Sequence, residues 1–428
     1  MNTFRLAALF LSFGTALPAL AQRQRCGTPE PVAGLDSGGA PSDCGYLTNS
    51  PQPQYEPTYF YDIPVVFHVI RHNNGDGFLS AGTIRDQIDI LNEDFQAIPG
   101  TPGGPGTNSR IRFHLATEDP QGNPTTGITY TVNNNWYNDS GNYWSSLHWD
   151  TSRYLNIYTN APPCCYGYIS EWASQGAAGM PNDRVVLWWE AVGRNPTPGW
   201  PLNMGRTASH EVGHYLGLYH TFCGGCGTSN CYGTGDLICD TERQSSATLG
   251  CPSSPSSCGS PDPFHNYMDY TDDPCLWEFT PEQVNRMRCT LEHWRPDVFR
   301  VYPPTELPRA GSPPNPAALL PGQTSGPRAG EVWDPLVDHT SFEPAATADF
   351  LLLSFQPTNL PGGTSGTLLC QPPFPLVTAN LTPGTPFSIQ IPNDPALLGR
   401  AFCVQAAALL PGLQVRMTNA LDCIVGNG

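Results

Sequence analysis

Apolar and polar positions predict a mixed α/β region over the first two thirds of the chain. Residues 62–70 are almost continuously apolar, which predicts a buried strand. Across residues 80–97, apolar side chains recur every three or four positions and predict an amphipathic helix. Three further β-rich runs follow, at residues 111–116, 154–158 and 183–189. A strand, a helix and then more strands indicate an α/β lobe built on a sheet.

The last third of the chain has a different pattern. Thr280 and Pro281 mark the N-cap and first turn of a helix that we expect to end near Trp294. Residues 303–339 are rich in Pro, Gly and Ala and are expected to form a linker. Beyond them, short β-like runs alternate with turns, so residues 340–428 are expected to form a small all-β accessory domain.

Composition places the protein outside the cell. Residues 1–21 resemble a secretory signal peptide, with an apolar stretch after Arg5 and small residues near Ala21. No later stretch is apolar enough to span a bilayer. The fifteen cysteines then suggest disulfides, and the odd count leaves at least one thiol unpaired. A formal charge of -17 argues against nucleic acid or an anionic membrane as a partner.

One short stretch carries the chemistry. His210 and His214 are four residues apart, so on a helix both imidazoles lie on one face and can bind one metal ion. Glu211 lies beside them, and Gly217 permits a sharp turn that returns His220. Three His ligands with one open position describe a catalytic zinc rather than a closed structural site. The alternative is a surface helix that carries histidines by chance, which would require five residues to match the metal-binding motif by coincidence.

The sequence after this stretch resembles a known family. A Met in an expected tight turn, within residues 265–270, follows the zinc motif in the order found in metzincin proteases. The chain resembles the pappalysin family over about residues 63–294. The matching stretches are residues 210–222, 235–236, 240–241, 250–252, 266–273, 275, 279–281, 283 and 286–287. The resemblance implies a metzincin catalytic domain, here residues 58–302, with a twisted sheet, an active-site helix and an irregular lower lobe. It implies hydrolysis of protein or peptide substrates.

The resemblance also assigns roles to two residues near the motif. It places Met268 beneath the zinc as an apolar floor, although a plain core Met would look the same in sequence. It places Tyr270 near the metal, where its hydroxyl would stabilise the oxyanion during catalysis. The alternative for Tyr270 is a packing role.

The same resemblance implies a function for a lone cysteine near the N-terminus. Cys26 lies in an Arg-Cys-Gly-Thr stretch that, in this family, belongs to a propeptide and blocks the zinc with its thiolate. Residues 22–57 would then be a propeptide, and activation would need cleavage before Tyr59. The alternative is a disulfide between Cys26 and Cys44.

Family members also bind calcium after the zinc helix, and Asp236 and Thr241 match those positions. With Asp240 they offer the oxygen ligands that calcium prefers, whereas the alternative is a solvated acidic turn. The resemblance further suggests two disulfides, Cys231–Cys258 and Cys251–Cys275. The Cys223 and Cys226 pair could be half of a second zinc site, but no second pair completes one.

Together these features predict a secreted, monomeric zinc endopeptidase. Glu211 would take a proton from the metal-bound water and pass it to the leaving amine. Some pappalysins cut before Arg or Lys, and here Asp272 and Asp273 are the candidate acids for that pocket, although Pro274 and Cys275 stand where the acid is expected. The competing predictions are a non-catalytic binding protein displayed through its β domain and a zinc hydrolase of non-peptide substrates.

Overall fold

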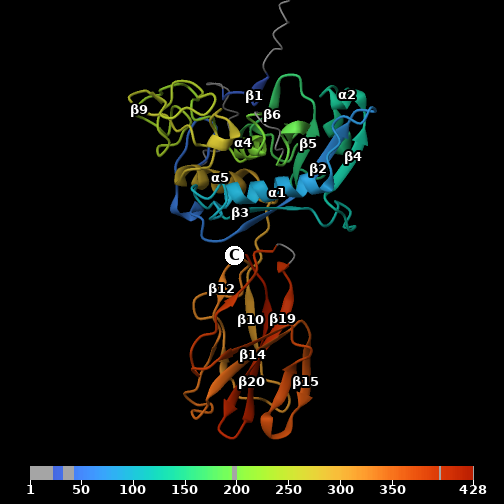
Figure 1. Ribbon diagram of the computed structural model, residues 1–428, viewed down its shortest axis with the longest axis vertical. Coiled ribbons are helices and arrows are strands. Elements are labelled where there is room, and N and C mark those ends of the chain that lie inside the picture. The colour runs from blue at the N-terminus through green and yellow to red at the C-terminus, as the bar shows by residue number, and fades with distance from the viewer. Residues whose placement is uncertain (1–22, 32–42, 195–199, 395–396, 428) are drawn as a thin grey trace, which may run out of the picture.

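The structure, a computed structural model, describes residues 23–31, 43–194, 200–394 and 397–427. The expected signal peptide, residues 1–21, lies outside the described residues. The chain forms an α/β lobe and a β-rich lobe, which occupy the upper and lower halves of Figure 1. Among the described residues, every helix is too short or too polar to cross a membrane.

A seven-stranded sheet forms the framework of the α/β lobe. Its order is β1-β6-β7-β5-β2-β3, and β4 also pairs with β2. All of these pairs are parallel except β6 with β7. The strands are β1 (Gln24–Cys26), β2 (Tyr61–Arg71), β3 (Ile111–Leu115), β4 (Ile128–Val132), β5 (Leu155–Asn160), β6 (Cys165–Ile169) and β7 (Val185–Trp188). The strand expected at residues 62–70 is thus a buried interior strand that pairs with β3, β4 and β5, and the N-terminal segment supplies one edge of the sheet.

Three longer helices pack on this sheet or beside it. They are α1 (Ala81–Phe95), α4 (Arg206–Tyr215) and α5 (Pro281–Trp294), with short α2 (Asn134–Tyr137) and α3 (Tyr143–Leu147). Ser80 caps α1 by accepting a hydrogen bond from the Thr83 amide, and Thr280 forms a capping box with Gln283. The apolar face of α1 and all of α4 are buried in one core with the sheet. The helices expected over residues 80–97 and from Thr280 to about Trp294 are thus confirmed as α1 and α5.

The β-rich lobe begins earlier than its sequence suggests. Its main sheet is antiparallel in the order β10-β20-β19-β14-β17, so β10 (Thr305–Arg309) joins it from within the expected linker. The expectation of a linker over residues 303–339 is therefore wrong. Pro308 is tolerated because β10 is an edge strand that pairs only with β20. The remaining bounds are β11 (Leu319–Leu320), β12 (Val332–Trp333), β13 (Leu336–Val337), β14 (Ala348–Ser354), β15 (Pro357–Pro361), β16 (Thr367–Cys370), β17 (Leu376–Asn380), β18 (Ile389–Gln390), β19 (Ala401–Leu410) and β20 (Gln414–Ile424).

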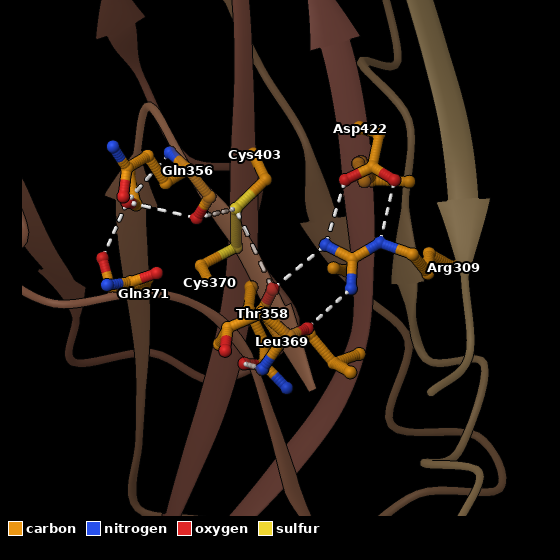
Figure 2. The surroundings of a disulfide bond; sticks show 12 residues. Arg309, Gln356, Thr358, Leu369, Cys370, Gln371, Cys403 and Asp422 are labelled. Atoms are coloured by element: carbon orange, nitrogen blue, oxygen red, sulfur yellow. Dashed lines mark hydrogen bonds and ion pairs between the residues drawn. A yellow bond between two sulfur atoms is a disulfide. The ribbon is translucent and has the colours of Figure 1, made fainter. Parts of the chain in front are cut away.

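Polar and covalent contacts fix the β-rich lobe internally and against its neighbour. Figure 2 shows the disulfide between Cys370 and Cys403, beside a two-bonded ion pair from Arg309 to Asp422. The two lobes meet where Arg112 Nη1 donates to Asn393 Oδ1 at 2.6 Å, and where Arg110 pairs with Glu331 at 2.7 Å. The lobes are therefore joined by charged and polar contacts as well as by the chain.

The disulfides agree with the sequence expectations only in part. Cys251 is bonded to Cys275, as the resemblance suggested. The expected bond between Cys231 and Cys258 is wrong, because Cys231 pairs with Cys239 and Cys258 pairs with Cys226. The loop brings the α-carbons of Cys231 and Cys239 to 5.2 Å, well inside bonding range.

The remaining cysteines decide two open alternatives. Cys44 is bonded to Cys289 on α5, so it does not pair with Cys26. Cys223, like Cys26 and Cys423, is a buried free thiol, and its neighbour Cys226 is used in a disulfide. Cys223 and Cys226 therefore do not act together as half of a second zinc site.

Candidate metal centre and cleft

Helix α4 and the turn after it bring three imidazoles together. His210 and His214 lie one turn apart on α4, with 3.1 Å between their Nε2 atoms. The chain then reverses at Gly217, whose φ of +90° lies in the left-handed region that favours glycine. The turn returns His220, whose Nε2 atom lies 3.0 Å from His214 Nε2. The three residues that the sequence singled out thus converge on one point.

Hydrogen bonds at the far side of the rings fix this orientation. The Nδ1 atom of His210 lies 2.6 Å from the Tyr267 carbonyl oxygen, and that of His214 lies 2.7 Å from the Leu218 carbonyl. An Nδ1–H that donates to a carbonyl leaves Nε2 with a lone pair for a metal. Burial also lowers the pKa of both rings well below the ordinary value, which favours the neutral form that binds metal.

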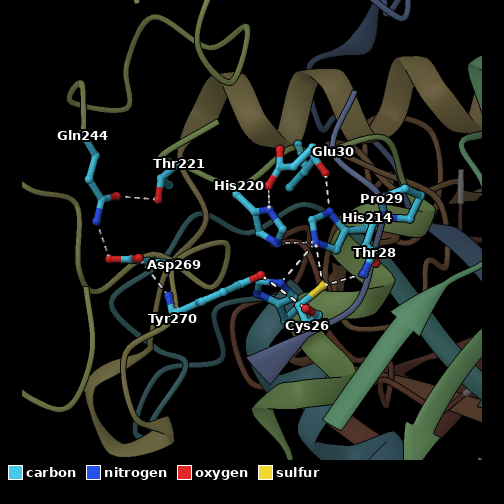
Figure 3. Close-up of polar contacts among 12 residues, drawn as sticks. Cys26, Thr28, Pro29, Glu30, His214, His220, Thr221, Gln244, Asp269 and Tyr270 are labelled. Atoms are coloured by element: carbon cyan, nitrogen blue, oxygen red, sulfur yellow. Dashed lines mark hydrogen bonds and ion pairs between the residues drawn. The ribbon is translucent and has the colours of Figure 1, made fainter. Parts of the chain in front are cut away.

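The thiol of Cys26 completes a set of four donors. Its Sγ atom lies 3.5 Å from His214 Nε2, and one donor atom from each of Cys26 and the three histidines lies within 4.8 Å of the others. Figure 3 shows the sulfur pointing at the imidazoles from strand β1. Three nitrogens and one sulfur are the donor chemistry that Zn²⁺ prefers. The residues present therefore fit a zinc ion, with Cys26 in the position that water or substrate would need.

The carboxylate of Glu211 faces the same point but is held by the N-terminal segment. Thr28 Oγ1 donates a hydrogen bond to Glu211 Oε2 at 2.9 Å, and Cys26 Sγ lies 3.5 Å from the same oxygen. The other oxygen, Oε1, is buried and has no hydrogen-bond partner among the described residues. Burial raises the pKa of Glu211 to about 8, and a cation on the imidazoles would favour its ionised form. Glu211 is thus placed to exchange protons beside the metal position.

Met268 and Tyr270, the two residues of the expected Met turn, both pack against the segment that carries the three histidines. Met268 is fully buried beneath α4, so close that a Cβ atom at Gly213 would lie 2.6 Å from its sulfur. The ring of Tyr270 packs 5.0 Å from that of His220, and its hydroxyl donates to the Cys26 carbonyl oxygen at 3.4 Å. Tyr270 therefore contacts the backbone of Cys26, the residue whose thiol faces the histidines.

A buried acid lies on one side of the metal position. Asp273 Oδ2 accepts hydrogen bonds from the amides of Met204 and Arg206 at the start of α4. Its Oδ1 accepts one from Arg25 Nη2 at 2.8 Å, and the Asp273 side chain is fully buried. Asp272 is partly exposed and forms no such pair with Arg25. Of the two candidate acids, Asp273 is the one that binds a guanidinium.

Sequence reasoning missed three residues that act with Cys26. Arg25 reaches Asp273, Thr28 reaches Glu211, and Glu30 Oε1 lies 2.7 Å from His220 Nδ1. They come from the same short stretch, because β1 runs parallel to β6 and carries the chain past the site. Arg25 was visible in the motif that identified Cys26, but its partner is 248 residues away and no spacing could reveal it.

The calcium candidates do not all face one place. Asp236 and Thr241 line a small cavity of about 20 Å³, and Thr241 Oγ1 donates to Asp236 Oδ2 at 2.7 Å. Burial raises the pKa of Asp236 to about 7. Asp240 points elsewhere, because its Oδ2 accepts the Glu282 amide at the start of α5. Of the three, only Asp236 and Thr241 are brought together.

Comparison with known proteins places this site in a family. Residues 138–292 match the peptidase family described as pregnancy-associated plasma protein-A. An extracellular metalloprotease of Verticillium alfalfae is 34% identical over 65% of this chain and 95% of its own. One from Pyricularia oryzae is 35% identical over 69% of this chain and 97% of its own. The chain belongs to the pappalysin family. It is therefore an extracellular metalloendopeptidase, which excludes the two competing predictions, and the family implies a catalytic zinc.

A solved structure also matches this pappalysin. Mature mirolysin of Tannerella forsythia in complex with a cleaved peptide is 34% identical, over 57% of this chain and 100% of that one, with a TM-score of 0.46.

Proposed function

We propose that His210, His214 and His220 hold the catalytic zinc and that Glu211 is the general base. The convergence of three Nε2 atoms within 3.1 Å of their neighbours carries this proposal. When bound, zinc supplies a water whose pKa is lowered to about 7 and polarises the scissile carbonyl. The Glu211 carboxylate would accept a proton from the attacking water and donate it to the leaving amine.

Tyr270 is the proposed second donor to the oxyanion. Its hydroxyl already donates to a peptide carbonyl, that of Cys26, beside the metal position. A substrate carbonyl in that place would receive the same hydrogen bond, which strengthens as negative charge develops on the oxygen.

The described form of the chain is latent in this proposal. Cys26 takes the fourth donor position, and Thr28 and Cys26 both contact Oε2 of Glu211, the oxygen that faces the thiol. Neither a water nor a substrate carbonyl fits beside the histidines while the thiol is there. Activity therefore requires proteolytic removal of the stretch that contains Cys26.

We propose a preference for Arg, and secondarily Lys, immediately after the cut bond. The support for this preference comes from the chain itself. Arg25 pairs with the buried carboxylate of Asp273, as the Arg side chain of a substrate would. The guanidinium forms a charge-assisted hydrogen bond there and a second one to the Thr271 carbonyl oxygen. A lysine ammonium would make fewer of these contacts.

A structural calcium ion is proposed at the cavity beside Asp236 and Thr241. The support is geometric, because the Asp236 carboxylate and the Thr241 hydroxyl line one cavity of about 20 Å³, which has room for one ion, and both supply the oxygen ligands that calcium prefers.

Casein cleavage tests the proposed function. After activation, a chelator should abolish cleavage and added zinc should restore it, whereas calcium alone should not. Cleavage that survives complete removal of zinc would overturn the assignment of the three histidines.

A further inference from the structure

Two parts of the N-terminal segment are attached to the enzyme in different ways. Residues 24–30 make only noncovalent contacts with the cleft. Residues 43–57 are tied by the disulfide between Cys44 and Cys289. Trp294 Nε1 donates to the Cys44 carbonyl oxygen at 3.1 Å, and Asn285 Nδ2 donates to that of Gln52 at 2.8 Å. The second part is therefore fastened to α5 along its length.

This second part also holds the loop that carries the third histidine. Arg286 on α5 is buried, and its Nε atom donates to the carbonyl oxygen of Gly217, the turning point before His220. Its two terminal nitrogens donate to the carbonyl oxygens of Gly45 and Thr48, at 2.8 and 3.1 Å. One guanidinium thus spans the zinc loop and the N-terminal segment.

A second bond joins the same elements. Tyr219, next to His220, donates its hydroxyl hydrogen to the Tyr46 carbonyl oxygen at 2.6 Å, and the two tyrosine rings meet edge to face. Both side chains are buried. Without residues 43–48, the Tyr219 hydroxyl would lose this acceptor and Arg286 would lose two, and buried unpaired polar groups cost stability.

We infer that the activating cut falls on the N-terminal side of Cys44, and that residues 44–57 remain in the mature enzyme as a strap that positions His220. This inference rests on the proposed latency. Hydrolysis of one peptide bond by one water frees the stretch with Cys26 and leaves a new amino terminus ahead of Cys44. A cut nearer Tyr59 would instead leave the propeptide covalently attached through Cys289. The strap thus belongs to the mature catalytic domain rather than to the propeptide.

The mass of the activated wild-type enzyme, measured intact with and without a reductant, tests the location of the cut. The expected result is a single chain that includes Cys44 and loses no peptide on reduction. A peptide containing Cys44 that is released only by reductant, or a mature chain that begins after Cys44, would overturn the inference. Failure of the proposed latency is distinguishable, because the uncut chain would then already cleave casein.

A disulfide variant tests the positioning role. In the activated Cys44→Ser/Cys289→Ser enzyme, loss of zinc to a chelator should be roughly tenfold faster, the scale seen when groups that orient metal ligands are removed. The matched control is Cys370→Ser/Cys403→Ser, which removes a disulfide from the β-rich lobe and should leave zinc loss unchanged. Equal zinc loss in both variants would contradict a role for the strap at His220. If the first variant does not fold, Arg286→Lys provides the same readout, since it keeps the charge but not the three bonds.

Discussion

Thr28 Oγ1 donates a hydrogen bond to Glu211 Oε2 across 2.9 Å, two residues after Cys26, whose thiol reaches the histidines. The same few residues therefore contact both the three histidines and the proposed base. Figure 3 shows them entering the site together with Glu30, which contacts the outer nitrogen of His220. The proposed latency thus depends on several contacts, and these can be removed one at a time.

Removing the thiol should release activity before any cleavage. In Cys26→Ala the fourth donor is lost, so water can reach the zinc although Thr28 and Arg25 still hold the segment. We expect the uncut variant to cleave a peptide substrate measurably, where the uncut wild type does not. Cys423→Ala is the matched control, because it removes a buried free thiol from the β-rich lobe. If neither uncut variant cleaves the peptide, the thiol alone does not hold the enzyme inactive.

The residue after the thiol has no room for a side chain. A Cβ atom at Gly27 would lie far inside contact distance of Cys165 Sγ and 3.2 Å from Cys164 Sγ, the two atoms of an adjacent disulfide. Gly27→Ala should therefore displace the segment and speed its proteolytic removal by an added protease, as followed by gel. Gly82→Ala, on α1, adds the same methyl group with nothing nearer than 3.4 Å and should activate at the wild-type rate. An unchanged rate in Gly27→Ala would contradict this packing.

Asp273 should determine the preference for basic residues. Asn at this position keeps an oxygen for the Met204 and Arg206 amides but loses the charge that binds a guanidinium. We expect kcat/KM for peptides with Arg after the cut to fall roughly tenfold to a hundredfold, the range for a lost charged hydrogen bond. Digestion of a peptide library measures this, with Asp272→Asn as the control. A preference that survives in Asp273→Asn and disappears in the control would assign the pocket to the other acid.

A buried histidine outside the site should make stability depend on pH. His68 on β2 bonds to Asn156 and Thr129, and burial lowers its pKa from 6.5 to about 4. In the unfolded chain the pKa of His68 returns to 6.5, so below that pH the unfolded chain binds a proton that the folded chain does not bind. The stabilising contribution is complete above pH 6.5 and is lost as the pH falls towards 4, by about 2 kcal/mol at pH 5.

Urea unfolding at about pH 7 and pH 5 checks this prediction. Between pH 7 and pH 5 the free energy of unfolding should fall by about 2 kcal/mol less in His68→Gln than in the wild type. His293→Gln, which alters an exposed histidine on α5, should behave like the wild type. Identical pH dependence in all three proteins would rule out His68 as the source.

Local patterns predicted the parts of the structure that depend on local physics. The spacing of apolar residues and the caps at Ser80 and Thr280 located α1 and α5 to within two residues. The i, i+4 histidines and Gly217 defined a metal site because helix geometry alone brings two of its donors together.

Features that depend on distant partners could not be predicted in this way. Cys44 and Cys289 are 245 residues apart, and the bond between them forms only because the fold brings a loop to α5. The composition of residues 303–339 predicted a linker, but the segment contains β10, because a Pro-rich segment can still form an edge strand. The partner of Arg25 was hidden for the same reason as that of Cys44.

The most direct test of the zinc and general-base assignment is the rate of peptide hydrolysis by activated Glu211→Gln, prepared with its zinc content measured. The amide keeps the size of the side chain but cannot accept the proton, so hydrolysis should fall roughly 10²- to 10⁴-fold while one zinc per chain remains. Hydrolysis at the wild-type rate by zinc-loaded Glu211→Gln would contradict the account.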